Sequence, residues 1–165
     1  MSDTLEVWMR GPVEEVPALL QPVAHALLQA VEDAEEKLIN IRPAALWQRP
    51  NGVASVGFHL LHMRGVVDRM FTYALEQPLS ETQFAALKAE TEIHDNVTAA
   101  DLVTGFKQKV AEAIKQLKQT KETALTETRY LGRKRIPVTL MGLLFHAAEH
   151  IQRHMGQALV TAKML

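Results

Sequence analysis

Residues 138–165, VTLMGLLFHAAEHIQRHMGQALVTAKML, decide how we interpret the whole chain. The segment has no internal proline, and its apolar residues recur every three or four positions, which is typical of an amphipathic helix. We expect this helix to begin near Thr139 and to run almost to Leu165. Its predicted buried stripe consists of Leu140, Leu143, Leu144, Ala147, Ile151, Leu159 and Val160.

Proline interrupts a helix, and the earlier prolines leave further windows that can each hold one. The apolar spacing predicts a first helix over residues 23–41 and a second over about residues 52–77. A third helix begins at Thr98 and extends past Leu117. The windows show no sustained alternation of apolar and polar residues, so we expect no sheet. The predicted fold class is all-α, a four-helix bundle that forms a single domain over residues 1–165.

A short extra helix is expected between the second and third long helices. Ser80 and Gln83 have the spacing of a capping box, in which each residue satisfies a backbone amide of the other. The predicted helix ends at about Glu90.

The charge balance of the chain argues against several classes of partner. There are 18 basic and 19 acidic residues, which gives a formal net charge of −1. No overall electrostatic field would therefore attract nucleic acid or an anionic membrane. The first residues lack the order of a signal peptide, and no apolar run approaches the roughly 18 residues of a membrane span. We expect a cytoplasmic protein that acts on a small molecule, without nucleic acid or membrane partners.

The histidines are the residues that indicate a possible metal site. The chain has no cysteine, so a metal site with nitrogen or sulfur ligands would have to use imidazole. Five of the seven histidines fall in two short segments: His59, His62, His146, His150 and His154.

The last three of these histidines are four residues apart along one predicted helix. Each step of four residues turns by about 40° and rises by about 6 Å, so the three side chains follow one side of the helix. His150 and His154 point into the bundle, and His146 lies toward its margin. Two inward imidazoles one turn apart can converge on a metal ion, although a hydrogen-bonded core histidine is the common alternative.

The second helix offers the third ligand that a stable site needs. His59 lies inside the apolar arc of that helix and His62 at its edge, so helical periodicity favours His59 without settling the choice. Three imidazoles with one open position are the usual pattern of catalytic zinc, and nickel, iron or manganese are also compatible.

Two segments resemble the DinB/YfiT-like family of metal-binding four-helix bundles. They are residues 55–65, SVGFHLLHMRG, followed by Asp68-Arg69, and residues 142–157, GLLFHAAEHIQRHMGQ. The resemblance implies a metal triad of His62, His150 and His154, because Met63-Arg64-Gly65 follows His62 as the family pattern suggests. It also implies up-down-down-up topology and a homodimer. His59 and His146 stay as substitute or supporting ligands.

Family members with known activity are S-transferases or isomerases that use low-molecular-weight thiols. The resemblance thus implies a metal-dependent transferase that joins such a thiol to an electrophilic small molecule. The metal would be zinc or nickel, with iron or manganese as alternatives, and the thiol would be a cosubstrate because the chain has no cysteine. The competing hypothesis is a non-catalytic metal-binding protein or a dimeric interaction module. A closed shell of four ligands would favour that second reading.

Several other polar residues are candidates for supporting roles. Glu149 or Asp68 would orient a ligand imidazole, although a solvated or ion-paired carboxylate is the ordinary alternative. Gln157 would hydrogen-bond a substrate or contribute to local packing. Arg133 and Arg135 would hold the carboxylates of a thiol if their loop folds over the site, and would otherwise be solvated.

Overall fold

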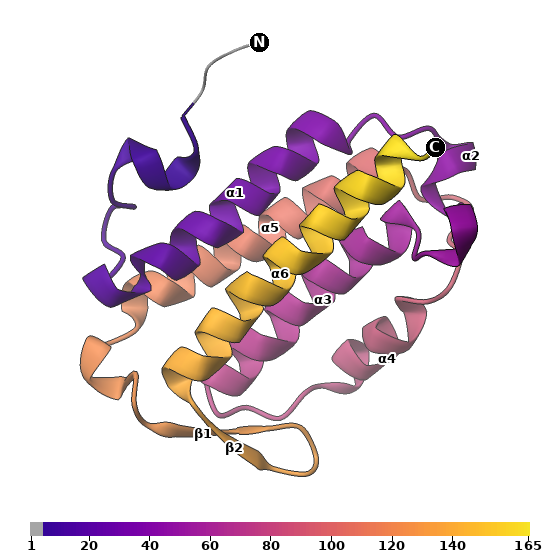
Figure 1. The fold of residues 1–165 in the computed structure, drawn as a ribbon. Coiled ribbons are helices and arrows are strands. Elements are labelled where there is room, and N and C mark those ends of the chain that lie inside the picture. The colour runs from indigo at the N-terminus through magenta and orange to yellow at the C-terminus, as the bar shows by residue number, and fades with distance from the viewer. Residues whose placement is uncertain (1–4) are drawn as a thin grey trace.

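The structure is a computed structural model and describes residues 5–165. Four long helices lie side by side (Figure 1): α1 (Gln21–Lys37), α3 (Val56–Ala74), α5 (Ala99–Gln119) and α6 (Leu140–Lys163). Helices α1 and α3 each pack against both α5 and α6, so α1 and α3 occupy opposite corners of the arrangement. The expectation of a mainly helical protein is confirmed.

Local capping residues fix where several helices begin. Thr139 accepts a hydrogen bond from the backbone N–H of Gly142 and starts α6, as expected. Ser80 and Gln83 form the predicted capping box at the start of α4 (Glu81–Ala89). The first long helix ends earlier than expected, and the chain is extended at Arg42 because Pro43 disfavours helical backbone before it. The remaining short helices are α2 (Pro43–Leu46), η1 (Val7–Arg10), η2 (Ala18–Leu20), η3 (Pro50–Gly52) and η4 (Glu122–Ala124).

The expectation that the chain has no sheet is wrong. The segment of the chain that connects α5 to α6 contains two strands, β1 (Thr128–Leu131) and β2 (Ile136–Thr139), which pair antiparallel. Each strand has four residues, which is too short for alternation to stand out from the sequence. Pro137 is tolerated because both strands of a two-stranded sheet are edge strands.

The interior of the bundle is apolar and draws on all four long helices. Its fully buried side chains fill the space between helix faces at close-packed density, which holds α3 and α6 in a fixed relation. Among the largest are Leu27, Leu60, Met63, Phe106, Leu117, Leu144 and Ile151. Among the described residues, no helix is both long enough and apolar enough to cross a membrane.

Candidate metal centre

Helices α3 and α6 bring four histidines together. Ser55 caps α3 by accepting a hydrogen bond from the N–H of Phe58, which sets the helix to begin just before its two histidines. His59 and His62 follow within the first two turns. His150 and His154 lie one turn apart on α6, which packs along α3.

His62, His150 and His154 form a compact cluster. The Nε2 atoms of His62 and His150 are 3.0 Å apart. The ring of His154 lies 4.4 Å from that of His62 and 4.6 Å from that of His150, measured between centroids. One nitrogen from each of the three residues lies within 4.8 Å of the other two. This spacing is compatible with a metal ion held by three imidazoles.

His59 lies next to this cluster and is buried. Its Nδ1 atom is 3.0 Å from Nδ1 of His154. The periodicity of the helix thus predicted correctly that His59 faces inward. Both histidines of α3 reach α6, His62 toward His150 and His59 toward His154.

The cluster favours neutral imidazoles. Burial, and to a smaller extent the neighbouring His62, lower the pKa of both His59 and His154 to about 4. Burial also lowers the pKa of His150. A neutral imidazole has a free lone pair and is the form that binds metal ions.

His150 carries an unsatisfied atom. Its Nδ1 is buried and has no hydrogen-bond partner among the described residues. Buried polar atoms are normally paired, so this nitrogen is an atom to which a water, ion or ligand could bind. Three imidazole side chains that each offer one nitrogen are a donor set that suits zinc, nickel or iron.

Glu90 also contacts the cluster, although sequence analysis predicted no role for it. It is buried, and its Oε2 lies 2.8 Å from Nδ1 of His62. Its other oxygen accepts a hydrogen bond from the buried Arg69. No motif or spacing identifies Glu90, because it lies 28 residues from His62 and outside any helix with an apolar stripe.

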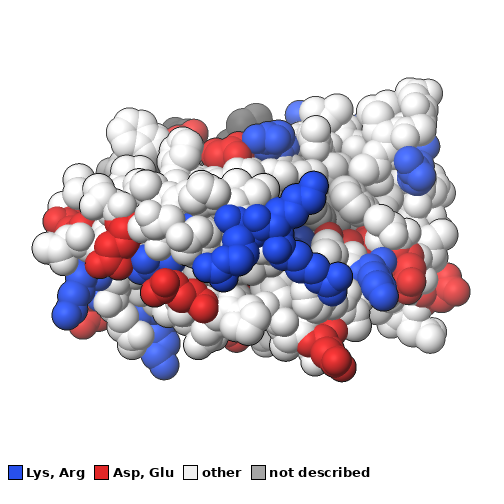
Figure 2. Space-filling view, turned by 90° about the horizontal axis from the view of Figure 1, so that it is seen from below, with Lys and Arg blue, Asp and Glu red and all other residues white. Residues whose placement is uncertain are grey.

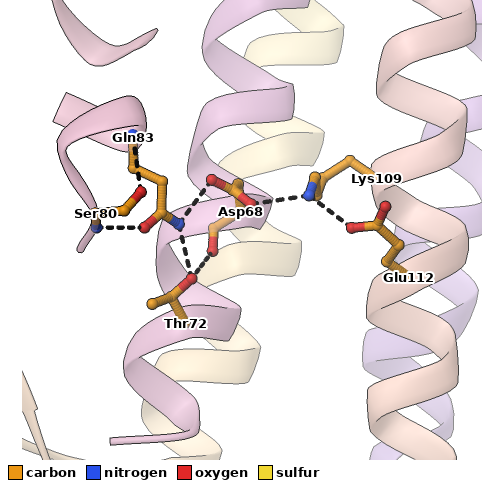
Figure 3. A network of polar contacts seen from close by, with 6 residues as sticks. All are labelled: Asp68, Thr72, Ser80, Gln83, Lys109 and Glu112. Carbon is orange, nitrogen blue, oxygen red and sulfur yellow. Dashed lines mark hydrogen bonds and ion pairs between the residues drawn. The ribbon is translucent and has the colours of Figure 1, made fainter. Parts of the chain in front are cut away.

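Asp68 and Glu149 were the carboxylates predicted to orient a ligand histidine, and the structure gives both of them other partners. Asp68 accepts a hydrogen bond from Gln83 and forms an ion pair with Lys109, so it does not orient a histidine (Figure 3). Glu149 contacts His146, with Oε1 2.8 Å from the ring Nδ1, and also pairs with Arg153. His146 and Glu149 nevertheless remain near His150, since one atom from each of these three residues lies within 4.8 Å of the others.

Arg133 and Arg135 are exposed on the hairpin, which matches the solvated alternative of the two that the sequence left open. Their guanidinium groups stack over the rings of Phe84 and Tyr130. The hairpin that carries them packs near the end of α3, where Arg129 donates to the carbonyl of Ala74, about 18 Å along the helix from His62. Figure 2 shows Lys and Arg side chains gathered on this lower face of the molecule.

Two cavities lie beside the histidines. One has a volume of about 450 Å³, and its lining includes His59, Gln157, Val160 and Met164. The other, of about 310 Å³, is lined in part by Trp47, Phe58 and Glu90. The ring of Phe58 also stacks on that of His62, with centroids 5.3 Å apart. Both cavities are large enough for a small molecule, and Gln157 lies where it can contact one.

The fold and the site together define a class of protein. It is a helical bundle in which two packed helices carry a cluster of imidazoles. The chain belongs to the DinB superfamily, whose family model matches residues 19–158. The matched range contains all of the histidines in the cluster.

Two solved structures have the same fold. A conserved protein from Enterococcus faecalis superposes with a TM-score of 0.68 and 23% sequence identity, over 88% of this chain and 95% of that one. A DinB-like protein from Bacillus cereus gives a TM-score of 0.61 and 16% identity, over 83% of this chain and 89% of that one. The comparison with curated proteins gave no match.

Proposed function

We propose that this protein binds a divalent metal ion through His62, His150 and His154. The observation that carries the proposal is the convergence of one nitrogen from each residue within 4.8 Å. The lowered pKa values of His150 and His154 support it, because both rings are then unprotonated at neutral pH. Zinc or nickel is the preferred ion, with iron or manganese as alternatives.

We further propose that the site serves a transferase that joins a low-molecular-weight thiol to an electrophilic small molecule. A bound divalent ion would act as a Lewis acid and lower the pKa of the thiol. In the transfer, the sulfur forms a bond to the electrophilic carbon, the leaving group departs with its bonding pair, and the thiol proton passes to solvent. The cavity beside His59 supports this role, since it offers about 450 Å³ next to the cluster.

The residues around that cavity have complementary tasks in this proposal. Val160 and Met164 would contact the apolar body of the electrophile, and Gln157 would donate a hydrogen bond to its polar group. Because the chain has no cysteine, the thiol enters as a cosubstrate.

The proposed chain topology is up-down-down-up, within a single DinB-like domain that assembles as a homodimer. The course of the chain in Figure 1 supports the topology: α1 and α6 run in one direction, and α3 and α5 run in the other.

A non-catalytic metal-binding protein is the second candidate, and His59 favours it. Its ring lies beside His154, with the Nδ1 atoms 3.0 Å apart. A turn of the His59 ring would add a fourth imidazole and close the coordination shell, as in structural zinc sites.

Metal analysis of protein purified without an affinity tag tests the metal site. We expect about one divalent ion per chain in the wild type and none in a His150→Ala, His154→Ala double variant. His146→Ala is the matched control from the same helix and should keep its ion. Equal, negligible metal in all three proteins would overturn the proposal.

Spectroscopy after cobalt substitution, followed by a kinetic assay, separates the two candidate functions. An open site should change its cobalt absorption when a small thiol is added, whereas a closed four-imidazole shell should not. The transferase should then accelerate loss of chloride from monochlorobimane with at least one thiol. Failure with every thiol, together with an unchanged cobalt spectrum, would favour the non-catalytic role.

A further inference from the structure

Glu90 is the buried carboxylate that contacts the histidine cluster. Helix α4 has no buried residue of its own, yet Glu90, the residue directly after it, is only 5% exposed. Its two oxygens face different partners. One lies 2.8 Å from Nδ1 of His62, and the other accepts from Arg69.

Glycine at position 65 makes room for this arrangement. A Cβ atom there would lie 2.1 Å from Oε1 of Glu90 and 2.6 Å from Nη1 of Arg69. Any other residue at position 65 would therefore displace the carboxylate or the guanidinium. The surface of α3 is thus shaped to receive Glu90 between His62 and Arg69.

Hydrogen bonds fasten the α4 segment in the position that delivers Glu90. The side chain of Gln83 donates to both Asp68 and Thr72 of α3, each at 2.8 Å (Figure 3). Lys109 of α5 lies 2.9 Å from the same Asp68. The α4 segment is therefore tied to α3, and the Asp68 that it contacts is in turn paired with α5.

The position of Glu90 decides which nitrogen of His62 carries hydrogen. A carboxylate only accepts, so the Nδ1 of His62 must donate to it. In a neutral His62 the other nitrogen, Nε2, then has a free lone pair and can only accept. The Nε2 of His150, 3.0 Å away, is the donor to it. In a neutral His150 the Nδ1 atom then carries no hydrogen and has a free lone pair. This Nδ1 is the buried atom without a hydrogen-bond partner among the described residues.

We propose that Glu90 is a positioning residue of the metal centre: it holds the Nδ1 hydrogen of His62 and so presents the Nε2 lone pair of His62 to the ion. The proposal rests on the proposed metal-binding function. A carboxylate behind a ligand histidine fixes its tautomer and ring orientation, and makes the ligand more basic.

Affinity for zinc, measured by competition with a chromogenic chelator, tests the proposal. Glu90→Gln should weaken binding by about 10- to 100-fold, the usual effect of losing such a partner. Glu149→Gln is the matched control, because Glu149 contacts His146, which is not one of the three proposed ligands. The zinc affinity of this variant should stay within about twofold of the wild type. Wild-type affinity in Glu90→Gln would overturn the proposal, as would an equal loss in Glu149→Gln.

Glu90→Gln leaves the buried Arg69 without its partner, which can impair folding. A Glu90→Gln, Arg69→Gln double variant removes both charges and keeps the proposal testable. It should fold, by circular dichroism, and still bind zinc more weakly than an Arg69→Gln single variant. Equal affinity in these two proteins would overturn the proposal.

Nitrogen NMR of the metal-free protein reports the tautomer of His62, which would not depend on Glu90 if Glu90 only stabilised the fold. The ring ¹⁵N shifts of His62 should show hydrogen on Nδ1 and a bare Nε2 in the wild type. In Glu90→Gln, Arg69→Gln the preference for this tautomer should fall. Hydrogen on Nε2 in the wild type would overturn the proposal. This result is independent of the proposed function, which fails separately if the wild type binds no metal.

Discussion

His62 and His150 point the same ring atom at each other: their Nε2 atoms are 3.0 Å apart although 88 residues separate them. The contact exists because α3 and α6 pack along their length and carry their histidines at matching heights. Two nitrogens at this distance share one hydrogen when both rings are neutral, and two protonated rings would repel each other. Two neutral rings in this arrangement are therefore suited to bind one metal cation between them.

Zinc should stabilise the fold against heat. At a free concentration 100 times its dissociation constant, a ligand that binds only the folded state adds about 2.7 kcal/mol. For a chain of this length the melting temperature should rise by about 5–10 °C. Differential scanning calorimetry with and without zinc measures the shift. A His154→Ala variant should show no shift, and a comparable rise in that variant would contradict the metal assignment.

The metal-free protein should lose stability as the pH falls from about 6.5 toward 4. His59 and His154 have a folded-state pKa of about 4, below the ordinary value of 6.5, so the unfolded chain binds more protons in this interval. The contribution of these two histidines to the free energy of unfolding is complete above pH 6.5 and is lost as the pH approaches 4. Urea unfolding in the presence of a chelator measures this. A His59→Gln variant should have a shallower pH dependence, and an identical slope would contradict the prediction.

Gly57→Ala should destabilise the fold by about 1–3 kcal/mol through overpacking. A Cβ at this position would lie 2.6 Å from ring atoms of Trp47, and a rigid indole cannot shift cheaply. Gly156→Ala is the control, because, beyond its own stretch of helix, no atom of residues 5–165 lies within 4 Å of the added Cβ. Alanine there should instead stabilise α6 by about 0.5–1 kcal/mol. Urea midpoints for the two variants should move in opposite directions.

Gln83→Ala should loosen the α4 segment without unfolding the bundle. The change removes one half of a capping box and the hydrogen bonds to Asp68 and Thr72, which are worth about 1 kcal/mol each. Hydrogen exchange should accelerate for the amides of residues 81–90 and stay unchanged in α5. Thr82→Ala, on the exposed surface of the same helix, should leave exchange as in the wild type. Unchanged exchange in Gln83→Ala would show that the segment is held by other contacts.

Features that depend on neighbouring residues could be predicted from the sequence. Thr139 starts its helix and Ser80 pairs with Gln83 because capping involves residues three positions apart. The spacing of His150 and His154 likewise fixed their common side of α6. The periodicity of α3 left His59 and His62 as alternatives, and both in fact face α6 because the arc that it buries is wide enough to include them.

Features that depend on distant contacts could not be predicted. Glu90 reaches His62 only because the α4 segment folds back along α3, and no local pattern encodes that path. The same holds for Arg133, whose distance from the site follows from the end of the bundle at which its hairpin lies. The hairpin itself could not be predicted, because strands of four residues are too short to show a clear alternation.

The hairpin also has a practical use. Its turn projects from the lower end of the molecule in Figure 1, where the residues between β1 and β2 are largely exposed. A fluorescent probe, an affinity tag or a surface tether could be introduced there, well away from the imidazoles. Metal exchange and ligand entry could then be followed in the intact protein without adding histidines or cysteines near the centre.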